Sequence, residues 1–291
     1  MSLGDTPCRR IETRGGTIQA CVIGTGPPLL LLHGFAQSRM MWGPVVQALA
    51  DTHTLVIPDL PGYGDSDAPA TVEKASKRAM AASLVQMMEV LGFAAFDLAG
   101  HDRGGRVAYR MALDHPQCVT RLAVLDILPT SDYWDKMDRA FALKIYHWAF
   151  LAQPYPLPET MIGGEPDFWL EWTLKSWTMA RSLDCFDPDA MAHYRHNFHD
   201  PSRLKAMCDD YRAGATVDVE HDLASRKAGQ KIEAPTLVLW GASGIAQSAE
   251  TPLEIWRTWC RTVEGTAIRA GHFLPEENPA DTGAALARFF A

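Results

Sequence analysis

Short apolar runs alternate with helical patterns along most of the chain, and this alternation constrains the fold more than any other feature. Strand-like runs occupy residues 17–24, 27–34, 52–59, 96–100, 119–127, 234–241 and 262–270. Helical patterns lie at 38–50, 71–91, 103–116 and 252–260, and a last one ends at Ala291. Several runs are continuously apolar, which indicates parallel strands covered on both faces. The sequence therefore predicts an α/β fold, with a mostly parallel sheet and helices on both faces.

The alternation stops between residues 128 and 231. This stretch is helical in pattern and holds five of the nine tryptophans, at 134, 148, 169, 172 and 177. A crossover between two parallel strands needs only about a dozen residues. Because the sheet pattern resumes afterwards, we expect a helical cap at 128–231, inserted into a single core formed by residues 1–127 and 232–291.

Composition excludes several classes of function. The formal net charge is −8 and no basic run occurs, which argues against nucleic acid or an anionic membrane as a partner. The six cysteines, at 8, 21, 118, 185, 208 and 260, are scattered singly without zinc-site spacing, so no metal site is expected. The N-terminus lacks the apolar segment of a signal peptide, and no apolar stretch reaches membrane-spanning length. These features predict a cytoplasmic protein.

The stretch AGHDRGGRVAYR at 99–110 places an aspartate where a strand meets a helix. Many hydrolases have the pattern G-x-S-x-G at such a turn, where sharp backbone geometry holds the nucleophile at the edge of the sheet. Here the pattern is GHDRG at 100–104, with Asp102 in the position of the serine. Asp102 could instead be a plain helix N-cap. The residues that follow in chain order favour a nucleophile.

A base and an orienting acid follow Asp102 in chain order. His272 comes after the last strand, in GHF, where a fold of this kind has its base. The usual position of the acid, in or after WGASG at 240–244, has no carboxylate, and the first one downstream is Glu250. Asp126 instead ends the strand before the predicted cap, where a buried carboxylate needs a partner. We interpret Asp126 as the acid that orients His272, with a loop-start or capping aspartate as the alternative.

An aspartate nucleophile predicts a particular kind of reaction. A serine that attacked a saturated carbon would give an ether, which is a dead end, whereas an aspartate gives an alkyl ester that water can cleave. Asp102 therefore predicts displacement of a halide or opening of an epoxide, followed by ester hydrolysis with water activated by His272. The backbone amide of Arg103, with an amide from the loop that ends at Phe35, would stabilise the oxyanion of that second step.

Two arginines follow the nucleophile on one helical face. Arg103 and Arg106 are three residues apart, and guanidinium groups bind carboxylates in a bidentate manner. A pair of cations here would lower the nucleophilicity of the aspartate unless a substrate anion neutralised them. We interpret the pair as a site for the substrate's own carboxylate; the alternative is that both pair with protein acids such as Asp126 or Asp132. For Arg110, one turn further on, we expect a structural role.

With these residues in place, the chain resembles the fluoroacetate dehalogenases of the α/β-hydrolase superfamily over nearly its whole length. The matching stretches are HGFAQS, PDLPGYGDSD, GHDRGGRVAYRMALDHP, LDILPT, YHWAFLAQPYPLPE, MCDDYRAGA, WGASGIAQS and GHFLPEENP. The arginine directly after the nucleophile, with YHW and DYRAG in the cap, is the more specific part. Haloalkane dehalogenases and many epoxide hydrolases usually have tryptophan at that position. The family also places its acid before the cap, where Asp126 lies.

The resemblance implies a role for each matched residue. Asp102 would be the nucleophile, His272 the base and Asp126 its partner. Arg103 and Arg106 would hold the carboxylate of a haloacetate, with fluoroacetate as the first choice of substrate and with glycolate and halide as products. The resemblance further implies that no metal or organic cofactor is needed and that the protein is a homodimer.

Three cap residues would form the halide pocket that the resemblance implies. His147, Trp148 and Tyr211 each carry an N–H or O–H donor. Fluoride is a poor leaving group but a small, hard acceptor, so donors that converge on it would stabilise the charge that develops in the transition state. Each residue could otherwise be an aromatic side chain that packs inside the cap.

Three alternatives stay open at this point. One is a dehalogenase that prefers chloroacetate or bromoacetate. Another is an epoxide hydrolase, which needs cap tyrosines as donors and is disfavoured by the arginine pair. The candidate donors are Tyr133, Tyr146, Tyr155, Tyr194 and Tyr211. A third is a non-catalytic ligand-binding protein with the same fold. The complete set of nucleophile, acid and base argues against this third alternative.

Overall fold

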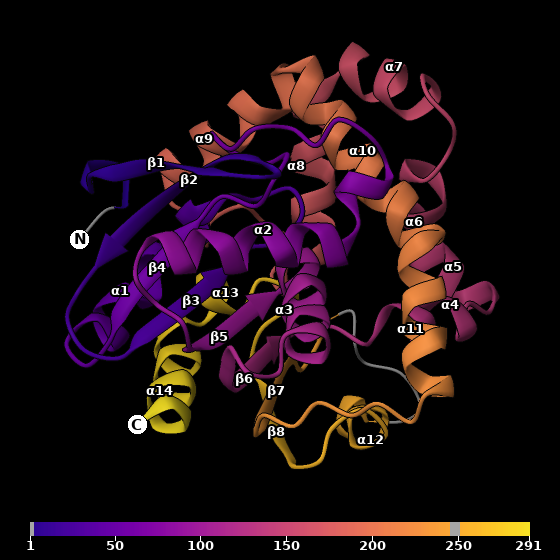
Figure 1. Ribbon diagram of the computed structural model, residues 1–291. Helices are drawn as coiled ribbons and strands as arrows, with labels where there is room; N and C mark the ends of the chain where they lie inside the picture. The colour runs from indigo at the N-terminus through magenta and orange to yellow at the C-terminus, as the bar shows by residue number, and fades with distance from the viewer. Residues whose placement is uncertain (1–2, 245–250) are drawn as a thin grey trace.

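The computed structural model describes residues 3–244 and 251–291 and contains one eight-stranded sheet (Figure 1). The strands are β1 Cys8–Thr13, β2 Gly16–Ile23, β3 Pro28–Leu32, β4 Thr54–Pro58, β5 Phe96–His101, β6 Val119–Leu125, β7 Thr236–Gly241 and β8 Val263–Ile268. Their order is β1-β2-β4-β3-β5-β6-β7-β8. The β1–β2 and β2–β4 pairs are antiparallel, and the remaining pairs are parallel. The predicted α/β class with a mostly parallel sheet is confirmed.

The central strands are buried, which explains their continuous apolar runs. All six residues of β5 are buried, and so are the last four of β3. Helices α2 (Lys77–Val90) and α3 (Asp102–Asp114) pack against each other, as do α1 (Gly43–Ala50) and α14 (Pro279–Phe290). Two short helices, α12 (Pro252–Arg257) and α13 (Leu274–Glu277), complete the C-terminal part.

Strand β1 and the start of helix α2 are among the features that differ from the expectation based on sequence. Strand β1 was not expected, because its sequence CRRIET is mostly polar and it lies at the edge of the sheet. The helix expected at 71–91 begins only at Lys77. Ser76 caps it there, since the Ser76 side chain accepts a hydrogen bond from the amide of Ala79. Residues Glu73–Ala75 form a separate 3-10 turn.

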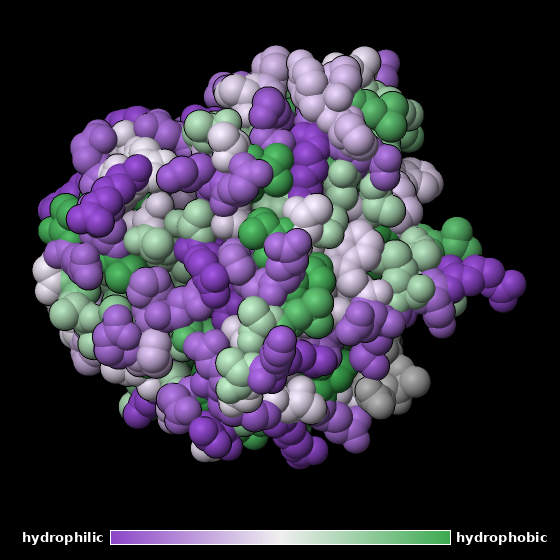
Figure 2. Space-filling view, turned by 45° about the vertical axis from the view of Figure 1, so that its right-hand side comes forward, coloured by the Kyte–Doolittle hydropathy of each residue, from purple (hydrophilic) through white to green (hydrophobic). Residues whose placement is uncertain are grey.

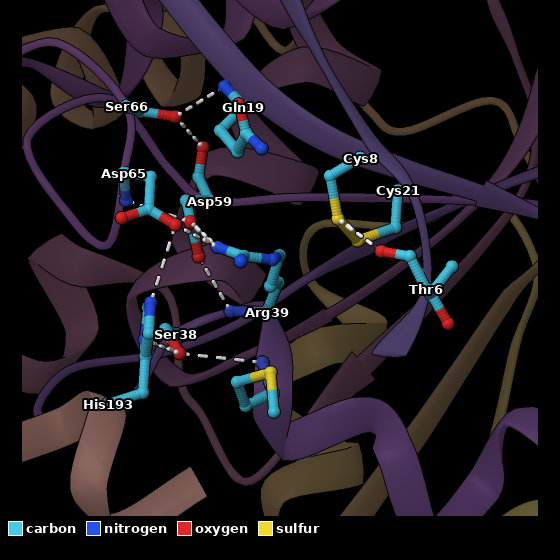
Figure 3. The surroundings of a disulfide bond; sticks show 11 residues. Thr6, Cys8, Gln19, Cys21, Ser38, Arg39, Asp59, Asp65, Ser66 and His193 are labelled. Atoms are coloured by element: carbon cyan, nitrogen blue, oxygen red, sulfur yellow. Dashed lines mark hydrogen bonds and ion pairs between the residues drawn. A yellow bond between two sulfur atoms is a disulfide. The ribbon is translucent and has the colours of Figure 1, made fainter. Parts of the chain in front are cut away.

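A disulfide joins the first two strands (Figure 3). Cys8 and Cys21 are direct register partners in the β1–β2 pair, with Cα atoms 4.1 Å apart. The cysteine pattern did not predict this bond, because the two residues become neighbours only through the register of the hairpin. Cys118, Cys185, Cys208 and Cys260 are free thiols.

Eight helices connect β6 to β7, and Figure 1 shows them along the top and right of the view. They are α4 Thr130–Asp135, α5 Arg139–Lys144, α6 Tyr146–Leu151, α7 Leu157–Gly164, α8 Pro166–Trp177, α9 Pro188–His199, α10 Pro201–Ala215 and α11 Val217–Lys227. The structure describes every residue from 128 to 231, and none of them belongs to a strand. The segment expected as a cap is therefore built of helices, turns and loops.

The surface mixes hydrophilic and hydrophobic residues. On the face shown in Figure 2, hydrophobic residues lie in small groups among hydrophilic ones. Within the described ranges 3–244 and 251–291, no helix is long and apolar enough to cross a membrane.

Candidate active site

Asp102 lies at a sharp turn between β5 and α3. It is the first residue of α3, it has a positive φ of 46°, and only 6% of its surface is exposed. Positive φ is unfavourable for a residue with a side chain, and such strain is concentrated at functional sites. The backbone amide of Phe35 donates a 2.8 Å hydrogen bond to Oδ1 of Asp102. This is the arrangement expected of a nucleophile elbow beside an oxyanion-binding amide, whereas a plain N-cap would not need a strained backbone.

Two glycines let the strand and helix approach at this turn. A Cβ on Gly100 would lie 2.5 Å from the carbonyl oxygen of Gly104. A Cβ on Gly104 would lie 2.3 Å from the carbonyl oxygen of His33. Both distances are far below van der Waals contact, so the GHDRG pattern needs glycine at both ends.

The structure brings the predicted acid and base to the nucleophile. Nδ1 of His272 donates a 2.6 Å hydrogen bond to Oδ2 of Asp126, and Nε2 of His272 lies 3.9 Å from Oδ2 of Asp102. His272 follows β8, Asp126 follows β6, and each is at most 2% exposed. The bond to Asp126 holds the imidazole so that Nε2 faces the nucleophile.

Glycines occupy the place where the sequence lacks the usual acid. A Cβ on Gly244 would lie 2.4 Å from Oδ1 of Asp126, and the amide of Gly241 donates to that oxygen at 3.0 Å. The WGASG stretch thus makes room for a carboxylate that arrives from β6. Glu250, the first carboxylate downstream, lies outside the described residues.

One carboxylate that the sequence analysis did not select holds the histidine loop. Glu277 accepts hydrogen bonds from the amides of Gly271 and Phe273, on either side of His272, and from the amide of Met179. The amide of His272 donates to the carbonyl of Trp177 at 2.9 Å. The loop that carries the base is therefore tied to the segment that follows α8.

Burial and nearby charges shift the pKa values of Asp102 and His272, the candidate nucleophile and base, in opposite directions. Burial alone would raise the pKa of Asp102, but the positive charges of His272 and of the nearby arginines outweigh it, so this pKa is lowered. Burial alone would lower the pKa of His272, but the hydrogen bond and charge of Asp126, with the charge of Asp102, raise it. Asp102 is therefore ionised at neutral pH, as a nucleophile must be.

The two predicted substrate-binding arginines differ in their partners. Arg103 is fully buried and donates from Nε and Nη2 to the carboxylate of Asp210, at 2.9 and 2.8 Å. The alternative that the arginines pair with protein acids therefore holds for Arg103, although its partner is Asp210 and neither of the two acids named as examples, Asp126 and Asp132. Sequence reasoning missed Asp210 although it directly precedes Tyr211, because only the fold brings α10 onto α3.

Arg106 is buried without a carboxylate partner among the residues that the structure describes. Its Nη1 donates to the carbonyl of Leu128 at 2.9 Å and to Oγ1 of Thr130 at 3.2 Å. Its guanidinium carbon lies 4.3 Å from the centre of the Trp148 ring and 4.9 Å from that of Tyr133. Burial, followed by the charge of Arg103, lowers the pKa of Arg106.

Arg110 contacts polar groups of the protein, which fits the structural role expected for it. Its Nη2 donates to Oγ of Ser225 at 2.8 Å, and it forms ion pairs with Asp114 and Asp222 at 3.4 and 3.9 Å.

The three predicted halide-pocket residues lie together. The ring centres of His147 and Trp148 are each 5.9 Å from that of Tyr211, and all three residues are at most 2% exposed. The ring of Trp177 bridges them to the base, because it lies 4.4 Å from His147 and 5.4 Å from His272. Burial lowers the pKa of His147 to about 3 and raises that of Tyr211 well above its ordinary value. At neutral pH the imidazole is therefore uncharged and the phenol keeps its proton.

Several buried polar atoms at this site have no hydrogen-bond partner among the described residues. They are Arg103 Nη1, Arg106 Nε, His147 Nδ1, Tyr211 Oη and His272 Nε2. A buried donor without an acceptor is costly, and native structures rarely keep one without a reason. Most of these atoms are donors, so the site is suited to an anionic ligand that would satisfy them.

One further group of possible metal ligands is already occupied by a protein cation. Asp59, Asp65 and His193 lie close enough to share an ion (Figure 3). The guanidinium of Arg39, however, forms ion pairs with both carboxylates, at 2.9 Å to Asp65. This cluster is therefore explained by an internal ion pair.

Comparison with known proteins identifies the family. Residues 27–279 match the family model described as the alpha/beta hydrolase fold. The chain is 41% identical to a fluoroacetate dehalogenase from a Burkholderia species, over 97% of this chain and 93% of that protein. It is 33% identical to a soluble epoxide hydrolase from a Corynebacterium species, over 92% and 91% of the two chains.

A solved structure agrees with this assignment. A putative alpha/beta hydrolase from a Nostoc species is 43% identical, with a TM-score of 0.95 and 99% coverage of both chains. The resemblance to fluoroacetate dehalogenase seen in the sequence is confirmed, and this chain belongs to the α/β-hydrolase fold family.

Proposed function

We propose that the protein is a hydrolytic dehalogenase that converts a haloacetate, with fluoroacetate as the first choice, and water to glycolate and halide. One observation carries this proposal. A buried, ionised aspartate at a strained elbow is surrounded by donors that have no acceptor in the part of the chain that the structure describes. A substrate with a carboxylate and a departing halide supplies an acceptor at each end, whereas a neutral substrate would leave Arg106, which has only neutral oxygen partners, without a counter-ion.

In the first step Asp102 displaces the halide. Its Oδ1 is held by the amide of Phe35, so Oδ2 is the oxygen that attacks the α-carbon. The carbon–halogen bond breaks as the carbon–oxygen bond forms, and the halide leaves with the bonding electrons. His147, Trp148 and Tyr211 donate hydrogen bonds to it, which stabilises charge that is absent in the ground state.

In the second step water cleaves the carboxymethyl ester of Asp102. The 3.9 Å between Nε2 of His272 and Oδ2 of Asp102 is too long for a direct hydrogen bond, so Nε2 is free to accept a proton from water. The hydroxide adds to the ester carbonyl carbon. The amides of Phe35 and Arg103 stabilise the oxyanion. On its collapse the protonated His272 returns its proton to the departing alkoxide oxygen, which releases glycolate, and the new carboxylic acid of Asp102 loses its proton to solvent and becomes a carboxylate again.

We propose the same organisation for the chain as a whole: residues 1–127 and 232–291 as the core, and 128–231 as the cap. The cap supplies the proposed halide pocket from α6 and α10, and the core supplies the nucleophile, acid and base. The homodimer and the cytoplasmic location that the sequence predicted stay predictions.

The direct test measures product from matched substrates. We expect fluoride from fluoroacetate, measured with an ion-selective electrode, and glycolate in equal amount. Chloride release from chloroacetate under the same conditions measures the halide preference. Halide release from chloroacetate alone would replace the fluoroacetate assignment with the chloroacetate alternative.

An epoxide hydrolase is the second candidate, because several relatives, including the Corynebacterium protein, have that name. Of the tyrosines that could donate to an epoxide oxygen, Tyr194 donates to Glu276 and Tyr155 is 65% exposed. The hydroxyl of Tyr211, in contrast, is buried and has no hydrogen-bond partner within the described part of the chain. Turnover of a neutral epoxide, with no halide from any haloacetate, would reverse our assignment.

The pH dependence should differ between the two steps. The lowered pKa of Asp102 keeps the nucleophile ionised in mild acid. The pKa of His272 is raised, so on acidification the imidazole takes up a proton and can no longer accept one from water. As pH falls, we expect steady-state turnover to be lost while one equivalent of halide is still released rapidly per site. Rapid-quench assays of halide over an acid pH series measure both, and parallel loss of the two would contradict this assignment of His272.

A further inference from the structure

The carboxylate of Asp210 is the fixed partner of Arg103. Nε and Nη2 of Arg103 donate to the two carboxylate oxygens at 2.9 and 2.8 Å, and Nη2 also donates to the carbonyl of Asp210 at 2.8 Å. A bidentate pair of this kind fixes the plane of the guanidinium. A Cβ on Gly214, one turn along α10, would lie 2.8 Å from Nη2, so the helix backbone closes over the group.

Asp210 is also the centre of a buried ion cluster. Tyr63 donates to its Oδ2 at 2.6 Å, and Lys77 forms ion pairs with Asp210 and with Asp218, the latter at 3.2 Å. The four charged members, Arg103, Lys77, Asp210 and Asp218, are each at most 3% exposed. Two cations and two carboxylates leave the cluster neutral without any ligand.

The two arginines of the site are therefore not equivalent. The charge of Arg103 is compensated inside the protein, and only its Nη1 lacks a hydrogen-bond partner among the described residues. Arg106, in contrast, has neutral oxygen partners, on Leu128 and Thr130. A bound carboxylate would thus compensate the charge of Arg106 while it accepts one directed hydrogen bond from Arg103.

We propose that Asp210 is a positioning residue for substrate binding: it fixes the guanidinium of Arg103 so that Nη1 is the nitrogen offered to the substrate carboxylate. This inference rests on the proposed haloacetate-binding role of the arginines. It predicts that the effect of Asp210 on ligand affinity passes through Arg103, and that Asp210 itself touches no substrate.

The experiment compares Asp210→Asn, Arg103→Met and the double variant. Calorimetric titration with glycolate measures Kd without any turnover, and KM for fluoroacetate is measured in parallel. We expect Asp210→Asn to weaken glycolate binding between about tenfold and a hundredfold, because a misdirected donor loses much of its value. In the Arg103→Met background the same change should have less than about a twofold effect, since coupled residues are not additive.

A neighbouring residue provides the matched control. Asp209 is on the same helix, is 3% exposed and forms its own ion pair with Arg212 at 2.7 Å. Asp209→Asn should leave the Kd of glycolate within about twofold of the wild type. If Asp210→Asn does not fold, the double variant Asp210→Asn with Lys77→Met replaces it, because it restores the balance of charge in the cluster. This double variant still lacks the bidentate acceptor for Arg103, so the same weakening of glycolate binding is expected.

The outcomes separate this inference from the proposed function. Absence of halide release with normal glycolate binding would count against the dehalogenase and leave the role of Asp210 testable by titration. The inference would be overturned if Asp210→Asn weakened glycolate binding equally with and without Arg103. It would also be overturned if the Kd of Asp210→Asn for glycolate stayed within twofold of the wild-type value. Failure of the wild-type protein to bind glycolate would overturn it as well.

Discussion

The His272→Asn variant is expected to release one equivalent of halide per site and then stop. Asparagine cannot accept the proton of the attacking water, whereas Asp102 stays ionised and can still displace the halide. Steady-state turnover should fall by about 10⁴-fold or more, as for other residues of catalytic triads. Rapid-quench measurement of halide against active-site concentration separates the first equivalent from later turnover.

Asp102→Asn is the matched control for this prediction. It keeps the size of the side chain and removes the nucleophilic charge, so neither the first equivalent nor later turnover should appear. Multiple turnovers by His272→Asn near the wild-type rate would show that this histidine is not the base. Halide release by Asp102→Asn would show that water attacks the substrate directly.

Arg106→Met is expected to reduce kcat/KM for fluoroacetate by about a hundredfold or more, mainly by raising KM. The substitution removes the buried cation that lacks a carboxylate partner among the described residues. Removing one partner of a buried charge pair costs about 2–5 kcal/mol. Steady-state kinetics on fluoroacetate measure the effect.

Arg110→Met, one turn further along α3, is the comparison. Arg110 is equally buried, but it donates a hydrogen bond to Ser225 and forms ion pairs with Asp114 and Asp222. Loss of the Arg110 side chain should lower the melting temperature and leave the KM for fluoroacetate within about twofold of the wild-type value. If Arg110→Met raised KM as much as Arg106→Met, the cation at 106 would have no special role in binding.

Much of the fold followed from local patterns. The apolar runs of β3 and β5 and the glycines around Asp102 are signals that a short stretch carries by itself. Strand β1 was missed because an edge strand can be polar. The Cys8–Cys21 disulfide was missed because it depends on the register between two strands. The start of α2 was placed too early because a cap at Ser76 is a single-residue signal.

The candidate catalytic residues were predictable to a similar extent. Asp102, Asp126 and His272 could be selected because each follows a strand whose end lies at the same edge of the sheet. Asp210 and Glu277 could not, because they act through contacts between elements distant in the chain. For Arg103 the partner is 107 residues away. The aromatic donors of the cap were identified by family resemblance, since a buried tryptophan or tyrosine has no local pattern that separates packing from catalysis.

The central claim is that Asp102 forms a covalent ester with the substrate. Mass spectrometry of the His272→Asn protein after incubation with fluoroacetate tests it most directly, with proteolysis to locate the modification. We expect one carboxymethyl group per chain, on the peptide that contains Asp102. If glycolate and fluoride form while the protein stays unmodified, or if the group is found on another residue, Asp102 is not the nucleophile.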